Sequence, residues 1–392
     1  MRLIGMATGL LTTLALVAVP TAVAADTGVA ASSASHRAAA KPRITASAAV
    51  PGRGGFVHAA ATRSGKFLFI SGPRGLTKYR ITPHRIVRLG TAPQLAQLHP
   101  TPHPFVLHAN GEFAYMPHEV GDHVVLRVID LRRDTPRLVR SVRVPSATYF
   151  TDVAISPRRG RFLYVLVEGG IRRFQLEVPG FPEYADRAPI DGRRLAVRPP
   201  LGNELAVGDT SSETTPDGEV LRSRLSGHET DDAALTTVAE APLTVAGRED
   251  EDLVVLDLMF SPRGASIYVT LLGQPSACEG ECGELDRTSI LRFRTSGGLA
   301  PKEVITAKHE FALEGMNAKG TRLYGIEPAT TWPSNRDATV VWYDAHLRRE
   351  HRLTGFRAAE TLTVSQRGDT RNLVYVVYGK GKGLRVSSVR VP

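Results

Sequence analysis

Four acidic residues stand directly in front of short apolar segments of the chain. They are Asp152 before Val153, Asp257 before Leu258, Glu314 before Gly315-Met316, and Glu360 before Thr361-Leu362. If those segments are strands gathered around one axis, the four carboxylates converge. Converging carboxylates bind a hard cation such as calcium, or raise one another's pKa until one serves as a general base. The plainer alternative is that each acid caps its own strand or pairs with a neighbouring arginine.

Three histidines, His58, His103 and His108, lie near comparable positions in the first two units of the repeat described below. His58, His108 and the four acids are the candidate catalytic groups, and the four acids alone are the candidate metal ligands. The chain has no G-x-S-x-G, H-E-x-x-H, P-loop or dinucleotide fingerprint at a strand-to-helix junction. Serine-triad hydrolysis is therefore disfavoured, and no cofactor other than calcium is indicated.

The chain contains two cysteines, Cys278 and Cys282, in a glycine-bearing segment. In an oxidising compartment two thiols this close most simply form a local disulfide. A soft-metal site on the two thiolates is the alternative, but it needs further histidine or cysteine ligands, and no histidine is near.

Composition excludes a disordered chain, because 42% of the 392 residues are hydrophobic and 22% are charged. The formal net charge is +10, yet residues 209–252 hold twelve acidic and three basic residues. We expect this acidic insertion to be a solvated loop. The alternative is a cation-dependent lid carried by the acids of residues 249–252.

A basic run alternates through Arg132, Arg133, Arg137, Arg140 and Arg143. This pattern favours an outer strand whose exposed edge is protected by charge. A nucleic-acid groove would need interleaved aromatic residues, and the run has none, so we expect no nucleic-acid partner.

The elements that would position these residues form a repeat. An alternating segment, a glycine-containing turn and an apolar triplet recur seven times, with turn glycines at Gly65, Gly111, Gly160, Gly202, Gly264, Gly320 and Gly368. Their mean spacing is about 50 residues, which is typical of four-stranded propeller blades. No window of the mature chain shows a convincing helical apolar stripe. The sequence therefore predicts an all-β, seven-bladed β-propeller with four-stranded antiparallel blades.

Ring closure follows from the ends of the repeat. The last unit offers strands near 361–365, 373–378 and 384–391, and is then one strand short. The first unit begins at Phe56, so residues 43–50 are free to supply the missing outer strand. We predict that this N-terminal strand closes the ring.

Residues 156–165 (SPRRGRFLYV) and 261–269 (SPRGASIYV) resemble the YVTN type of propeller repeat, found among lactonase-like seven-bladed propellers. The blades with Gly202 and Gly368 depart from the pattern. Functions in this group run from lactone hydrolysis to binding and surface-layer scaffolding, so the resemblance implies a shape and leaves the activity open. Residues 313–327 also resemble a strand opening of secreted, calcium-dependent phytase-like phosphoesterases.

The N-terminal residues have the pattern of a secretory signal. Met1-Arg2 precedes an apolar run from Leu10 to Val23 that ends in small residues. We expect a signal peptide over 1–24, a flexible Ala/Ser-rich lead-in over 25–54, and the propeller over 55–392, with no membrane-spanning segment after cleavage. The mature protein is then secreted and extracellular.

These inferences predict a secreted monomer that binds a small molecule, or a protein or polymer of the cell envelope. The alternative is a hydrolase of a lactone or ester centred on the channel, with a calcium-dependent phosphoesterase as a lesser alternative.

Overall fold

The computed structural model describes residues 43–391 except 53–56, 83, 97–102, 158–159, 201, 203, 216–217, 231–234, 249–250, 276–286, 297–298, 300, 307–310, 328–337, 349, 357–358, 366–372 and 381–382. The predicted signal peptide, most of the predicted lead-in and both cysteines lie outside the described residues. The described part contains no helix long and apolar enough to cross a membrane.

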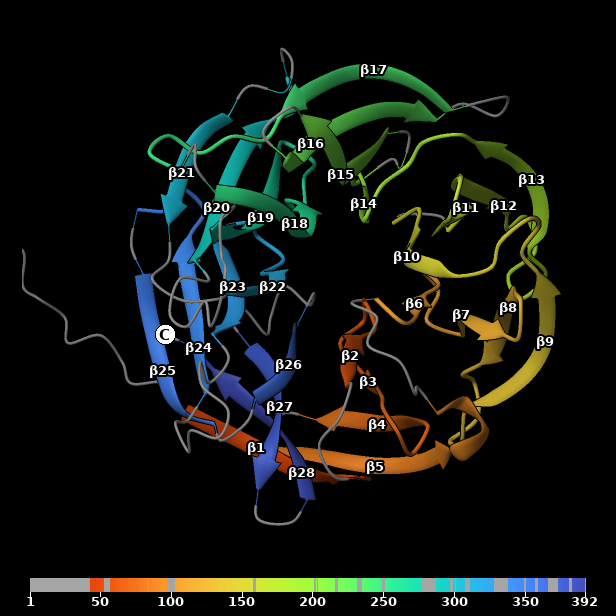
Figure 1. Ribbon diagram of the computed structural model, residues 1–392. Helices are drawn as coiled ribbons and strands as arrows, with labels where there is room; N and C mark the ends of the chain where they lie inside the picture. The colour runs from red at the N-terminus through yellow and green to blue at the C-terminus, as the bar shows by residue number, and fades with distance from the viewer. Residues whose placement is uncertain are drawn as a thin grey trace, which may run out of the picture. The chain divides into compact units, whose positions relative to one another are not determined.

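The described strands form seven four-stranded antiparallel sheets arranged around a central axis (Figure 1). This confirms the predicted seven-bladed β-propeller. We number the blades in chain order. Blades 1 to 3 consist of β2 His58–Ala61, β3 Phe67–Ser71, β4 Leu76–Thr82 and β5 Arg85–Ala92; β6 Val106–Leu107, β7 Phe113–Val120, β8 His123–Asp130 and β9 Arg137–Arg143; β10 Phe150–Ile155, β11 Phe162–Val167, β12 Gly170–Gln175 and β13 Glu183–Ala188.

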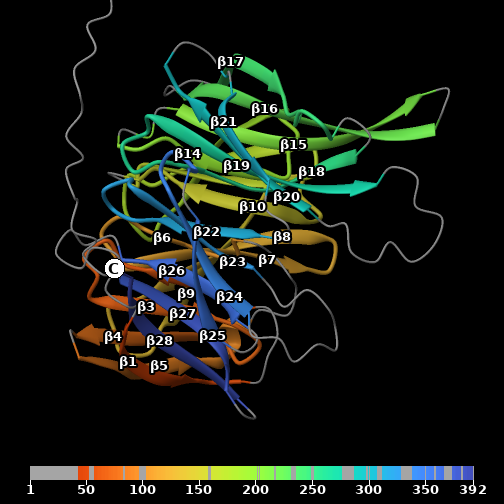
Figure 2. The same ribbon diagram turned by 90° about the vertical axis from the view of Figure 1, so that its left-hand side faces the viewer.

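Blades 4 to 7 follow the same order, with the first strand of each next to the axis (Figure 1). Figure 2 shows the same blades from the side. A 3-10 turn, η1 Pro93–Leu95, joins blades 1 and 2. The strands are β14 Arg194–Val197, β15 Glu204–Thr215, β16 Gly218–Thr230 and β17 Leu235–Pro242; β18 Glu251–Phe260, β19 Ser266–Pro275, β20 Arg287–Arg294 and β21 Pro301–Thr306; β22 Ala312–Met316, β23 Arg322–Glu327, β24 Ala338–Asp344 and β25 Glu350–Phe356; β26 Ala359–Val364, β27 Leu373–Lys380 and β28 Gly383–Arg390.

Blade 7 takes its fourth strand from the N-terminal end of the described chain, as predicted. Strand β1 (Arg43–Val50) pairs antiparallel with β28, from Arg43 opposite Arg390 to Val50 opposite Leu384. The two ends of the propeller therefore belong to one sheet (Figure 1).

The apolar triplets of the repeat lie in the second strand of every blade and are buried. In β11, for example, Leu163, Tyr164 and Val165 have no exposed surface. Seven apolar clusters result, and each spans two neighbouring blades. A single sheet this small cannot cover its own faces, so the blades stabilise one another around the ring.

The turn glycines behave as the repeat predicts. Six of them, Gly65, Gly111, Gly160, Gly202, Gly264 and Gly320, have positive φ values between 61° and 77°. Each lies in the turn between the first and second strand of its blade. Gly368 lies outside the described residues.

The expectation of a solvated acidic loop is wrong. Residues 204–215 and 218–230 form the long hairpin β15–β16, and 235–242 form β17. The hairpin is held in register from Glu204 opposite Glu229 to Thr215 opposite Gly218. Backbone pairing stabilises these polar segments as strands, although their side chains show no apolar alternation.

Candidate functional site

The inner strands bring one residue per blade to the same level of the channel. In each blade the backbone N–H of one residue donates a hydrogen bond to the carbonyl of the residue that begins the second strand, and we say that this donating residue opens the turn. The residues at this level lie four positions before it, for example His58 before Thr62 and Asp152 before Ser156. In blades 4, 5 and 7 this position holds Arg194, Asp257 and Thr361. The candidate site lies at this level of the channel.

Local bulges in the inner strands determine which acidic side chain faces the channel at this level. The inner strands of blades 3, 5 and 7 each have a register shift just before it, at Thr151, Leu256 and Glu360. In blade 6 the shift lies closer to the turn, at Glu314 itself. A bulge adds an unpaired residue and re-aims the side chains around it. Glu314 lines the channel as a result.

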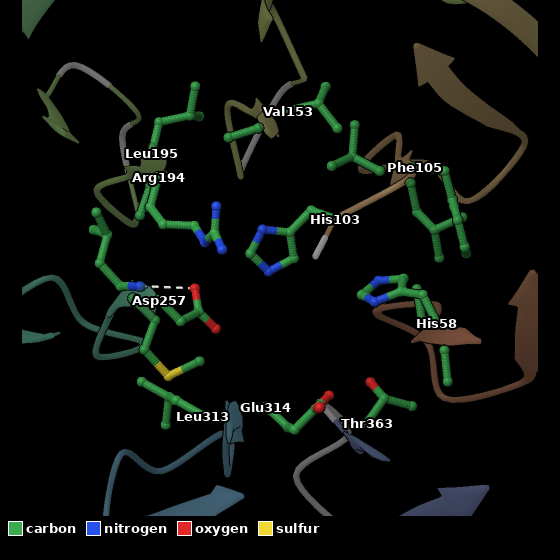
Figure 3. A pocket seen from close by; sticks show the side chains of 18 of the residues that line it. His58, His103, Phe105, Val153, Arg194, Leu195, Asp257, Leu313, Glu314 and Thr363 are labelled. Carbon is green, nitrogen blue, oxygen red and sulfur yellow. Dashed lines mark hydrogen bonds between the residues drawn. The ribbon is translucent and has the colours of Figure 1, made fainter. Parts of the chain in front are cut away.

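A cavity of about 610 Å³ occupies this part of the channel. His58, His103, Arg194, Asp257 and Glu314 line it (Figure 3). The rest of the wall is largely apolar, from Ala59, Phe105, Val106, Val153, Leu195, Leu256, Leu258 and Leu313. The cavity therefore combines a few polar groups with an apolar wall, as small-molecule sites usually do.

Asp152 lies behind this wall and holds His103. Its carboxylate accepts a hydrogen bond from His103 Nδ1 at 2.8 Å and is fully buried. It also accepts the backbone N–H groups of Val153 at 2.8 Å and Leu195 at 2.9 Å. The acid thus caps its own strand, ties blade 3 to blade 4, and orients the histidine ring in the cavity.

His103 is a cation at neutral pH. Burial disfavours its charged form, but the carboxylates of Asp152 and Asp257 outweigh that effect and raise the pKa of His103 to about 9. The ring of His58 lies edge-on to it, with centroids 5.8 Å apart. Burial and the charge of His103 lower the pKa of His58 to about 3, so His58 is neutral.

Arg194 and Asp257 face the same space from blades 4 and 5 (Figure 3). The Arg194 Nε donates to the carbonyl of Leu256, and Nη1 donates to the carbonyl of Arg193 at 2.7 Å. Within the described structure Nη2 has no hydrogen-bond partner. Asp257 accepts the backbone N–H of Leu258 at 2.7 Å, and burial raises the pKa of Asp257 despite the cations His103 and Arg194.

Glu314 is protonated at neutral pH. Burial raises its pKa to about 8, against the opposing effect of a hydrogen bond from the Thr361 hydroxyl to Oε2 at 2.9 Å. The backbone N–H of Leu362 also approaches Oε2, at 3.4 Å. Because both contacts use Oε2, the proton belongs on Oε1, and the carboxyl group can donate a hydrogen bond.

The structure does not bring the other candidates into this cavity. His108 opens the turn of blade 2, where its backbone pairs with Phe113, and its ring packs against Gly160. It therefore lies at the opposite end of the inner strand from His103. Glu360 occupies the bulge of blade 7, one position before Thr361, and does not line the cavity.

Among the described residues no group of three histidine, cysteine, aspartate or glutamate side chains could hold a metal ion. The carboxylate of Asp152 already accepts three hydrogen bonds from the protein, and Glu360 does not line the cavity. The four acids therefore do not form the calcium site considered from the sequence. Of the acids proposed for a lid, residues 249–250 lie outside the described part. Glu251 pairs with Arg248, and Asp252 accepts the backbone N–H of Leu221 at 3.2 Å.

Arg194 is the functional residue that sequence reasoning missed. The signal used in the sequence is an acid in front of an apolar segment, whereas blade 4 carries a base at this position. Counting four residues back from the residue that opens the turn would have found it, because Arg198 opens the turn of that blade. Three arginines of the basic run, Arg137, Arg140 and Arg143, are exposed on β9, the outermost strand of blade 2, as predicted. Arg132 and Arg133 lie before that strand.

The chain is similar to solved structures at low sequence identity. Hydrazine synthase from Kuenenia stuttgartiensis matches with a TM-score of 0.61 and 16% identity, over 88% of this chain and 98% of that one. A functionally unknown protein from Desulfotomaculum acetoxidans matches with a TM-score of 0.52 and 12% identity, over 74% and 82%.

A protein from Bacteroides uniformis that is provisionally named a 6-phosphogluconolactonase matches with a TM-score of 0.49 and 17% identity, over 82% of this chain and 94% of that one. This likeness is too distant to bear on activity. No protein-family model and no curated protein matches the chain, so the YVTN repeat stays a prediction. The propeller of Dos1 matches with a TM-score of 0.51 and 10% identity, over 84% of this chain and 77% of that one, and this match supports the β-propeller fold of this chain.

Proposed function

We propose that this chain is an exported β-propeller that binds a small organic acid in the central cavity. The observation that carries the proposal is the set of three hydrogen-bond donors facing one space: Arg194, protonated His103 and protonated Glu314. A carboxylate offers the matching acceptors. Charge-assisted hydrogen bonds of this kind are stronger than neutral ones, and a cavity with apolar walls strengthens them further.

Asp257 adds selectivity to this arrangement. Its carboxylate accepts hydrogen bonds, so it favours a ligand that carries a hydroxyl group beside the acid. The Asp257 charge also keeps the cavity near electrical balance when no ligand is bound, because Arg194 and His103 are both cationic. A 2-hydroxy acid fits these groups better than a simple carboxylate does.

Binding is favoured over hydrolysis by the protonation states of the histidines. A general base works best with a pKa near the working pH. His103 is held protonated with a pKa of about 9, and His58 is a weak base with a pKa of about 3. Neither is suited to activate water at neutral pH.

Lactone or ester hydrolysis is the second candidate, because Asp257 and Glu314 present two carboxyl groups to one cavity. The pKa of Asp257 is raised, as a base requires, and the protonated Glu314 could donate to a leaving oxygen. This alternative predicts turnover of a simple lactone that is lost in Asp257→Asn. The binding proposal predicts no turnover in either protein.

Isothermal titration calorimetry with butanoate and 2-hydroxybutanoate at pH 7 tests the proposal. Loss of a charge-assisted hydrogen bond costs roughly 1.5–3 kcal/mol, so Arg194→Gln is expected to weaken binding by roughly 10- to 100-fold. Arg193→Gln is the matched control, because that side chain is exposed at the adjacent position. The proposal fails if neither acid binds, or if the two variants bind equally well.

A further inference from the structure

A second cavity, of about 530 Å³, continues the channel toward the turns that join the first and second strands. It shares four lining residues with the first cavity: Ala61, Leu107, Met259 and Glu314. The two spaces therefore meet at Glu314 and Met259. The second cavity therefore lies next to the first, on the side of the turns.

The walls of the second cavity come from the turns of the repeat. The Ser-Pro turns contribute Pro157 in blade 3 and Pro262 in blade 5, and blade 4 contributes Pro199 and Pro200. Proline fixes the backbone of these turns. The same prolines line the cavity with apolar rings.

The remaining lining is also predominantly apolar. Met259 and Phe260 close one side from blade 5, and Met316 and Ala318 close another from blade 6. Methionine side chains adapt to flexible apolar ligands. The polar side chains that line the cavity are Arg63, which is exposed, His108 and the shared Glu314. Beyond Glu314 the space offers few partners for a polar ligand and much contact for a hydrocarbon.

We propose that the ligand is an elongated amphipathic acid, with its carboxylate at Arg194 and His103 and its hydrocarbon tail in the second cavity beyond Met259. This inference rests on the proposed function, since the head group is the organic acid proposed for the first cavity. The protonated Glu314 lies between the two spaces, where a neutral carboxyl group lets a tail pass with less desolvation than a charged one would.

The test is a chain-length series by isothermal titration calorimetry: butanoate, hexanoate, octanoate and decanoate at pH 7, below their micelle concentrations. Burial of a methylene contributes about 0.8 kcal/mol, so each methylene that enters the second cavity is expected to raise affinity by up to about fourfold. Affinity should rise with length and then level off.

Two variants locate the tail. Ala318→Trp fills part of the second cavity and is expected to stop the rise at a shorter acid while leaving butanoate binding unchanged. Phe260→Ala removes apolar wall and is expected to reduce the gain per methylene. Ala246→Trp is the control, because Ala246 is exposed away from the channel. Unchanged thermal melting verifies the fold of each variant.

The outcomes separate the two proposals. If short acids bind but affinity does not depend on length, or if Ala318→Trp behaves like the unmodified protein, the amphipathic ligand is wrong and the acid-binding cavity stands. If no acid of any length binds, the proposed function itself fails.

Discussion

At the scale of single residues, the candidate site depends on which side chains hold protons. Asp152 uses its carboxylate to keep His103 charged, whereas burial keeps Glu314 neutral. Asp152 accepts three hydrogen bonds, one of them from the His103 cation, while the strongest contact of Glu314 is with the single hydroxyl group of Thr361.

Glu314→Gln is predicted to change the pH dependence of stability. Below its ordinary pKa of 4.5, Glu314 is protonated in both folded and unfolded chains. Between pH 4.5 and about 8 the unfolded chain releases this proton and the folded protein keeps it, so the free energy of unfolding falls as pH rises. The Glu314 contribution to this slope is at most about 1.4 kcal/mol per pH unit, and Glu314→Gln should remove it.

Urea unfolding at several pH values between 4.5 and 9 measures this slope. Glu177→Gln serves as the control, because Glu177 is an exposed acid of blade 3. Parallel stability curves for the unmodified protein and Glu314→Gln would show that Glu314 titrates normally, and would remove the neutral donor from the proposed site.

Sequence reasoning found two acids of the cavity, Asp257 and Glu314, and missed Arg194, although Arg194 lies at the same position of the repeat as Asp257. Asp257 and Glu314 were predictable because each precedes the apolar residues that lead into the turn, and both lie within an inner strand, β18 or β22. Glu360 did not reach the cavity, because a bulge moved Thr361 into its place. Bulges depend on pairing with the neighbouring strand, which the local sequence does not report.

At the scale of elements, the turn between the first and second strand is the best-predicted feature of the chain. Its glycine adopts a backbone conformation that other residues reach only with strain. In blade 5 the turn is also tight: a Cβ added to Gly264, at φ +69°, would lie 2.1 Å from the carbonyl oxygen of Pro199 in blade 4. This glycine therefore serves both the turn and the contact between blades.

Gly264→Ala is predicted to destabilise the protein by more than Gly121→Ala does. Both glycines have positive φ, but a Cβ on Gly121 would meet nothing within 4 Å. Strain alone costs about 1–2 kcal/mol, which is the loss expected for Gly121→Ala. Gly264→Ala adds a backbone clash to that strain. Urea unfolding of the two variants checks the order, and equal losses would show that the blade contact relaxes at no cost.

The acidic hairpin shows where element prediction fails. Segments such as Ser211-Ser212-Glu213 lack the alternation that marks a half-buried strand, and their charge favours a loop. Long-range packing decides otherwise: Thr210 accepts the backbone N–H of Val255 at 3.0 Å, and Ser223 donates to the carbonyl of Leu253. These contacts join blade 4 to blade 5 and could not be read from residues 209–252 alone.

At the scale of the whole molecule, the seven apolar clusters form a closed series, and the cluster between blades 7 and 1 is completed by β1. Val50 is buried in it, and Ala46 and Ala48 pack against it. The Tyr79 hydroxyl of blade 1 also donates to the carbonyl of Ala49 at 3.0 Å. The closing strand was predictable because each blade needs four strands and the last blade had only three. This requirement applies to the chain as a whole.

Removal of β1 is therefore predicted to destabilise the entire ring. A chain that begins at Pro51 leaves the edge of β28 unpaired over the stretch that now faces residues 43–50, and such an edge promotes association between molecules. Loss of the buried Val50 side chain alone costs roughly 1.5–3 kcal/mol, and the lost strand pairing adds to it. Compared with a chain that begins at Lys41, we expect a single unfolding transition at a melting temperature lower by about 10 °C or more, together with aggregation.

A synthetic peptide of residues 43–50 should restore part of the loss by pairing with β28, and a peptide with the order of these residues scrambled should not. An unchanged melting temperature without β1 would mean that blade 7 is stable with three strands, and that closure by the N-terminal strand does not hold the propeller together.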